Sequence, residues 1–290
     1  MTNAATTSHH ARSIAISWQS LAIHACLIIG ALVMIYPLLW LASSSVKPPN
    51  LIFSDLSLWP ARLRLQNYVD GWRGAALPFS TFFLNSFIIS GFAVIGNVLA
   101  CSMVAYAFAR LNFALKKTLF ALMMLTIMIP LHATLIPQYA LFYNLGWVNT
   151  FLPLIVPKFL AVDAFFIFLM VQFIRGIPRE LDEAATVDGA GPIRIYWSII
   201  LPLLTPALVT TAVFSFIWTY EDFLSPLVYL TSMDKYTVPQ GLSLLMSSKG
   251  ASSWGPLLAM SLLSLVPLFL VFFIFQRRLI EGIAATGLKG

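Results

Sequence analysis

The sequence predicts an all-α integral membrane protein with six transmembrane helices, and its composition and charge spacing both support this. Hydrophobic residues make up 59% of the 290-residue chain and charged residues only 10%, whereas about 25% of a soluble domain is charged. The mean hydropathy is +0.87. Five stretches without Asp, Glu, Lys or Arg each exceed the about 20 apolar residues that a helix needs to cross a bilayer. The lipid bilayer is therefore the expected solvent for most of the chain.

We expect a transmembrane domain over residues 20–276, between a cytoplasmic N-terminal tail (1–19) and a cytoplasmic C-terminal tail (277–290). The first apolar stretch is too long for a signal-peptide core and lacks a small-residue cleavage site, so we expect it to remain as a span. The six expected spans are 20–43, 81–108, 118–138, 153–175, 206–230 and 256–276.

The basic residues favour both termini in the cytoplasm, because cytoplasmic loops are enriched in Lys and Arg. In that topology ten basic residues lie inside and six outside, four of the six in one long outer loop, 46–80. The net charge of +6 is scattered, with no basic cluster interleaved with aromatic residues. Nucleic acid is therefore not an expected partner.

A charged loop, residues 175–205, separates the fourth and fifth expected spans. Seven charged side chains lie within 175–194, and near the membrane centre they would cost on the order of 20 kcal/mol. The loop is therefore expected in the cytoplasm, outside the lipid.

The first half of this loop has the pattern of a short helix that ends in a turn. Pro178 suits the first helical position, and three acids follow it, where the helix dipole favours anions. The sequence VDGAGP then ends the helix, with Gly189 suited to a left-handed cap and Pro192 to the start of a second helix. Taken alone, acids at a helix start are also ordinary capping.

The second helix is expected to present one apolar face to the protein and to end at Pro202. The apolar residues that recur at helical spacing are Ile193, Tyr196, Trp197 and Ile200.

Seven residues of this loop also have a distinctive spacing: Glu183, Ala184, Ala185, Gly189, Ile199, Leu201 and Pro202. This spacing resembles the shared loop of ABC importer permease subunits, which has E-A-A, three residues, G, nine residues and I-x-L-P. From about residue 30 onward the chain is similar to the MalG-like carbohydrate group, in NYVDGW, AYAFARLNF and the terminal FQRRLIEGIAATGLKG. The fifth span departs from that group, because TYEDF stands where W-N-x-F is usual.

The resemblance implies a type I ABC importer permease fold whose first loop helix is a coupling helix, docked on a separate ATPase. It implies that the residues of ATPase coupling are Glu183, Ala184, Ala185, Asp188, Gly189, Leu201 and Pro202. The implied partners are a pair of ATP-binding cassette subunits, a second and distinct permease subunit, and an extracytoplasmic binding protein that delivers a sugar-like solute. The implied location is a bacterial or archaeal cytoplasmic membrane.

Enzymatic activity is not expected of this chain. It has no GxxxxGK[ST] loop, so ATP and Mg²⁺ are expected on the partner ATPase, with no cofactor or metal bound here. The histidines form no HExxH motif, and the acids cluster only in the loop. Two alternatives stay open: a permease for an amino acid, peptide or polyamine, and a secondary carrier that works without an ATPase.

The candidates for the solute pathway are Asp163, Asn85, Tyr220 and Glu221. Asp163 is expected about 18 Å along its helix from Arg175, and an acid at that depth normally faces a cavity or a partner. Pairing with Lys158 is the alternative role. Glu221 and Asp222 are expected near the outer end of the fifth span, where they either mark the interface or flank a gate.

Overall fold

The computed structural model describes residues 18–74, 76–248 and 254–287, and the regular elements within these ranges are all helical. The predicted N-terminal tail, 1–19, falls outside the described residues except for its last two, which begin the first helix.

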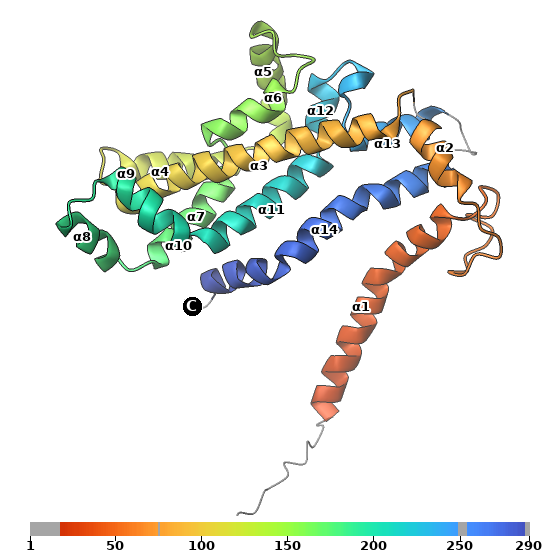
Figure 1. The fold of residues 1–290 in the computed structure, drawn as a ribbon, viewed down its shortest axis with the longest axis horizontal. Coiled ribbons are helices and arrows are strands. Elements are labelled where there is room, and N and C mark those ends of the chain that lie inside the picture. The colour runs from red at the N-terminus through yellow and green to blue at the C-terminus, as the bar shows by residue number, and fades with distance from the viewer. Residues whose placement is uncertain (1–17, 75, 249–253, 288–290) are drawn as a thin grey trace, which may run out of the picture.

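Three helices run side by side through the body of the protein: α3 (Phe79–Arg110), α11 (Thr205–Glu221) and α14 (Trp254–Gly287) (Figure 1). Helix α3 packs against α11 and against α7 (Ala164–Gly176). Their contacts enclose an apolar core, whose fully buried members include Cys101, Ala105, Met170, Val171, Ile174, Ile200 and Leu204. A second apolar cluster joins α3 and α14 at their other ends, around Phe79, Phe82, Ala259 and Met260.

Helix α1 (Trp18–Ser45) diverges from the other long helices (Figure 1). Only Ser43, Ser44 and Ser45, at its last turn, are buried. The most apolar part of the helix has no buried residue in this chain alone. This surface suits lipid or a second protein.

Six spans were expected, and in the structure fewer of them are single continuous helices. Within the described residues, four segments are long and apolar enough to cross a membrane: Trp18–Ser45, Phe79–Arg110, Leu152–Gly176 and Trp254–Leu279. A fifth crossing results if Pro192–Leu203 and Thr205–Glu221, which meet at a 75° bend, count as one.

The expected span 118–138 is divided into α4 (Lys116–Thr126) and α5 (Leu131–Asn144). Pro130 explains the division, since proline lacks an N–H for the helix and pushes the residue before it out of the α region. Pro130 itself is extended, with a ψ of 133°. The single helix predicted here is therefore wrong.

The expected span 206–230 is also divided, because α11 ends at Glu221 and α12 (Leu224–Tyr229) begins three residues later. Asp222 stabilises the break by accepting a hydrogen bond from the backbone N–H of Ser225, at 3.1 Å. Pro226 follows and cannot donate a backbone hydrogen bond to the preceding turn.

The expected span 153–175 is present as a continuous path of α6 (Leu152–Ile155), a 3₁₀ helix (Val156–Leu160) and α7. The 3₁₀ helix lies against α3 at Gly96. A Cβ atom on Gly96 would come within 2.9 Å of the backbone carbon of Lys158. Glycine is required there for the close approach.

The loop 46–80, expected on the outer side, contains the short helix α2 (Gln66–Gly74), which packs on α14. Lys47 organises the part before it. This side chain is only 1% exposed, and its ammonium donates hydrogen bonds of 2.6 Å to the carbonyls of Asp55 and Ser57. Asn67 closes the loop by donating to the carbonyls of Ser45 and Lys47.

The last expected span, 256–276, lies within α14, which continues to Gly287. Most of the predicted C-terminal tail, 277–290, is therefore helical, and its residues 288–290 lie outside the described part of the chain.

Candidate functional site

The charged loop folds into short helices gathered at one end of α3 and α11 (Figure 1). They are α8 (Glu180–Val187), α9 (Pro192–Ile195), a π turn (Tyr196–Ile200) and α10 (Leu201–Leu203). The helix–turn–helix expected from the sequence is present. We call residues 175–205 the coupling loop and α8 the coupling helix.

The coupling helix leaves most of the predicted ATPase-coupling residues accessible. The side of α8 that carries Glu183 and Ala184 is exposed, as are Asp188 and Gly189 beyond its end, whereas Ala185 is half-buried. Small side chains beside an acid form a surface on which another protein can approach closely.

Gly189 closes the coupling helix in the left-handed conformation expected of it, with a φ of +79°. Its N–H donates to the carbonyl of Thr186 at 3.0 Å, and the N–H of Ala190 donates to the carbonyl of Ala185 at 2.9 Å. This pair of bonds is a Schellman cap, which satisfies the last carbonyls of a helix. No heavy atom lies within 4 Å of a Cβ built on Gly189, so its backbone conformation alone requires glycine.

The apolar face predicted for the second helix is partly wrong. Tyr196 and Ile200 are buried, but Ile193 and Trp197 are 77% and 49% exposed. The buried face instead includes Ile195. A π turn, with i→i+5 bonding, begins directly after it at Tyr196.

Leu201 and Pro202 lie in the short helix that follows the π turn, so Pro202 does not end the helix as expected. The N–H of Leu201 donates to the carbonyl of Tyr196, five residues back. Pro202 has no N–H to continue the α pattern. The chain bends by 75° at Leu204, where it turns into α11.

Two functional candidates were missed from the sequence: Arg110 and Asp182. Arg110 is the last residue of α3, and its Nε lies 2.8 Å from Oδ2 of Asp182 on the coupling helix. The sequence places this arginine directly after a long charge-free stretch, a signal that topology alone also explains. The structure makes it the ionic contact between α3 and the coupling helix.

Basic side chains lie beside the acidic helix on the same end of the protein. Burial lowers the pKa of Lys116, and the positive charges of Arg179 and Arg175 lower it further. The ammonium of Lys116 donates a hydrogen bond to the carbonyl of Leu111 at 2.7 Å.

A pair of adjoining cavities is lined by α6, the 3₁₀ helix and α12, with α11 added in the smaller and α5 in the larger. The Lys158–Asp163 ion pair lines both of them. The smaller has a volume of about 460 Å³ and the larger about 680 Å³. Nζ of Lys158 lies 2.8 Å from Oδ2 of Asp163, with about a quarter of each side chain exposed. Asp163 is thus both paired and exposed to a cavity.

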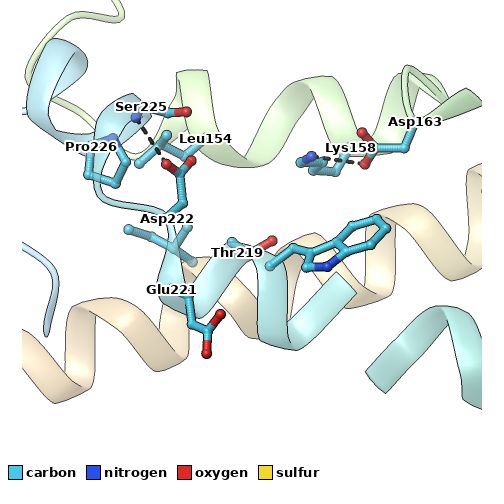
Figure 2. A pocket seen from close by; sticks show the side chains of 10 residues that line it. Leu154, Lys158, Asp163, Thr219, Glu221, Asp222, Ser225 and Pro226 are labelled. Carbon is cyan, nitrogen blue, oxygen red and sulfur yellow. Dashed lines mark hydrogen bonds and ion pairs between the residues drawn. The ribbon is translucent and has the colours of Figure 1, made fainter. Parts of the chain in front are cut away.

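The smaller cavity is also lined by the acids at the C-terminal end of α11, Glu221 and Asp222. Figure 2 shows Asp222 turned toward Ser225, which it caps, and the carboxylate of Glu221 pointing away from them. Thr219 contributes a hydroxyl to the same lining. The larger cavity adds aromatic walls, with Trp147 and Tyr229.

The other pathway candidates, Asn85 and Tyr220, line neither cavity. The amide of Asn85 donates to the carbonyls of Asp234 and Tyr236, at 2.8 and 2.9 Å. Tyr220 is 2% exposed and stacks on Phe216. Across the described part of the chain, no group of three or more His, Cys, Asp or Glu could hold a metal ion.

Comparison with known proteins identifies the family. Residues 96–284 match the family model described as "Binding-protein-dependent transport system inner membrane component". The chain belongs to this family. It is a multi-pass membrane component of a binding-protein-dependent ABC importer, a transport subunit and not an enzyme, and such an importer works with ATPase and solute-binding partners.

Curated relatives match along most of their length. The arabinooligosaccharides transport system permease protein AraQ of Halalkalibacterium halodurans is 35% identical over 90% of this chain and 93% of its own. The diacetylchitobiose uptake system permease protein NgcG of Streptomyces coelicolor is 31% identical over 90% and 86%. The trehalose/maltose permease protein MalG of Thermococcus litoralis is 31% identical over 91% and 96%.

A solved structure has the same fold. It is a bacterial ABC transporter involved in the import of the acidic polysaccharide alginate, and one of its chains matches with a TM-score of 0.79 at 22% identity. The match covers 93% of this chain and 99% of the other. The ABC importer permease fold expected from the sequence is confirmed.

Gly189→Val tests the cap of the coupling helix. A side chain at this positive φ costs roughly 1–2 kcal/mol, so we expect about a tenfold loss of the ATP-binding subunit co-purified with the chain. Membrane insertion should not change, because no heavy atom lies within 4 Å of a Cβ built on Gly189 and the new side chain therefore clashes with nothing. Gly191→Val is the matched control, since Gly191 has equal space and a φ of −77°. Equal recovery of the ATPase with both variants would contradict the role of the cap.

Proposed function

We propose that this chain forms half of the translocation pathway of an ATP-driven carbohydrate importer. The observation that supports it best is the match, over most of their length, to relatives named for the transport of diacetylchitobiose, arabinooligosaccharides and trehalose or maltose. The solute is therefore proposed to be a sugar or a related neutral oligosaccharide.

In this proposal the coupling loop makes the contact with the ATPase subunits. Glu183 makes a charge-assisted contact to the ATPase, Ala184 and Ala185 allow close packing, and Gly189 sets the turn. Leu201 and Pro202 connect this contact to the bend at the start of α11. The exposure of the coupling helix and its place beyond the ends of α3 and α11 support this assignment.

The proposed assembly has a pair of ATP-binding cassette subunits inside the cell, a second and distinct permease subunit in the membrane, and a solute-binding protein outside. The unburied face of α1 offers a surface for the second permease. ATP and Mg²⁺ are proposed to bind on the ATPase subunits, with no cofactor on this chain. Both termini are proposed to lie in the cytoplasm of a bacterial or archaeal cell.

The two adjoining cavities are the proposed solute surface of this half. Their combination of charged, hydroxyl and aromatic side chains suits a sugar, whose hydroxyls bond to polar groups and whose ring faces pack on apolar ones. Asp163 supplies an acceptor there, and Glu221 lines the smaller cavity with its carboxylate turned away from Asp222 and Ser225. Asn85 and Tyr220 stay weaker candidates, since each has a packing role elsewhere.

The direct test is ATP-dependent uptake by the complex purified through a tag on this chain. Proteoliposomes loaded with ATP are offered arabinotriose, diacetylchitobiose, trehalose, spermidine or glutamate, together with the cognate binding protein. We expect uptake of a carbohydrate that stops without internal ATP. Uptake of spermidine or glutamate instead would favour the other permease class, and uptake by this chain alone under an ion gradient would favour a secondary carrier.

Asp163→Asn tests the cavity assignment. Loss of a partly exposed ion pair costs at most about 1 kcal/mol, so assembly should not change, whereas loss of a charged acceptor for the solute should raise KM roughly tenfold. Lys158→Gln breaks the same pair and is the matched control. If both variants change transport of the accepted carbohydrate equally, or neither does, Asp163 is not a solute contact.

A further inference from the structure

The cytoplasmic half of α3 carries three polar side chains that all contact the coupling loop. They are Ser102, Tyr106 and Arg110, spaced four residues apart, and this spacing places them on one face of the helix. None of the three lines either cavity, and all belong to α3 rather than to the coupling helix. We call these residues and their partners the α3 joint.

Each of the three side chains makes its hydrogen bond or ion pair with a different part of the loop. The hydroxyls of Ser102 and Tyr196 lie 2.8 Å apart, and Tyr106 donates to the carbonyl of Pro192 at 3.1 Å. Tyr106 and Tyr196 also pack ring against ring, with centroids 5.4 Å apart. The second helix of the loop is thereby held at its start and at its π turn.

Arg110 holds the first helix of the loop. Its Nη2 donates to the carbonyl of Ile177 at 2.7 Å, and its Nε pairs with Asp182 at 2.8 Å. The side chain of Arg110 is 5% exposed and that of Asp182 is 18% exposed. An ion pair this sheltered from water is screened little, and loss of one partner leaves a buried charge without compensation.

The α3 joint therefore fixes the chain at both ends of the coupling helix. The exposed surface of that helix makes none of these contacts. The contacts with Ile177 and Asp182 lie at the start of α8, and those with Pro192 and Tyr196 lie beyond its Gly189 cap. When a helix is fixed to α3 at both ends, a displacement of the helix also displaces α3, because the helix cannot rotate relative to α3.

The opposite half of α3 holds an outer segment in the same way. Asn85 donates to the carbonyls of Asp234 and Tyr236, and the hydroxyl of Ser86 accepts the N–H of Val238 at 2.9 Å. In between, the amide of Asn97 donates to the hydroxyl of Ser215 on α11 at 2.9 Å. Polar contacts thus fasten α3 to other segments at each end and in the middle.

Helix α3 is a single helix of 32 residues with no internal proline, and so is roughly 48 Å long. We propose that α3 is the element that carries motion of the coupling helix to the outer loop 231–238, and that Arg110 and Asp182 are the positioning residues of its cytoplasmic joint. The inference rests on the proposed function, since it requires an ATPase to move the coupling helix.

Spin labels at two exposed positions test the joint. Leu84→Cys, near the outer end of α3, and Val187→Cys, on the coupling helix, are 61% and 88% exposed in the native residues. They are introduced with Cys26→Ser and Cys101→Ala, so that no other thiol is labelled. The distance between the labels is measured in nanodiscs, for the chain alone and for the ATPase-bound complex, without nucleotide and after trapping with Mg-ATP and vanadate.

With Arg110 and Asp182 present, we expect one narrow distance distribution that is the same in both nucleotide states. Asp182→Asn and Arg110→Gln should broaden it about twofold and lower the ATPase rate stimulated by the binding protein roughly tenfold, because each leaves a buried charge or polar group unpaired. The reversed pair, Arg110→Asp with Asp182→Arg, should restore both properties in part.

Arg110→Lys keeps the charge but loses the second donor to Ile177, so an intermediate effect is expected. Asp70→Asn is the matched control, since it breaks the exposed Arg64–Asp70 pair at 3.2 Å and should change neither measurement. If Arg110→Gln and Asp182→Asn fold poorly, the reversed pair and Arg110→Lys decide the outcome.

An unbroadened distribution in Asp182→Asn would overturn the joint. Broadening with normal ATPase stimulation would overturn its role in transmission. A wild-type chain that co-purifies with no ATP-binding subunit would instead reject the proposed function, and the widths measured on the chain alone would still decide whether the joint exists.

Discussion

The cost of placing charges in hydrocarbon determines how this chain is arranged. Its long helices are almost free of Asp, Glu, Lys and Arg, and the densest group of charges is collected in the coupling loop at one end of α3 and α11. Between the 3₁₀ helix and α7, Asp163 is paired with Lys158. The same cost that removes the loop from the bilayer makes it accessible to a soluble protein.

An exposed loop on the membrane surface is of no mechanical use unless it is held firmly. Here the Schellman cap at Gly189 fixes the end of the coupling helix, and the pair formed by Arg110 and Asp182 fixes its start to α3. The exposed surface of the helix carries acidic and small side chains together with Val187, which is 88% exposed. Rigid support on one side and an open surface on the other fit a helix that another subunit moves.

Much of this could be predicted from local sequence. The charge-free stretches located the spans, and the left-handed conformation of Gly189 followed from its place between two helix signals. The break at Pro130 was not predicted, because a proline in a membrane helix produces a kink or a full break according to its neighbours. The contact between Arg110 and Asp182 joins positions 72 residues apart, and one sequence contains no local signal for it.

We propose that the coupling helix is the contact with an ATPase on another polypeptide. The most direct measurement is cross-linking of Val187→Cys in native membranes with a short thiol-to-amine reagent, with Leu84→Cys, at the other end of α3, as the control position. We expect an ATP-binding cassette subunit to be captured from Val187→Cys and not from Leu84→Cys. Capture from neither position, or equally from both, would contradict it.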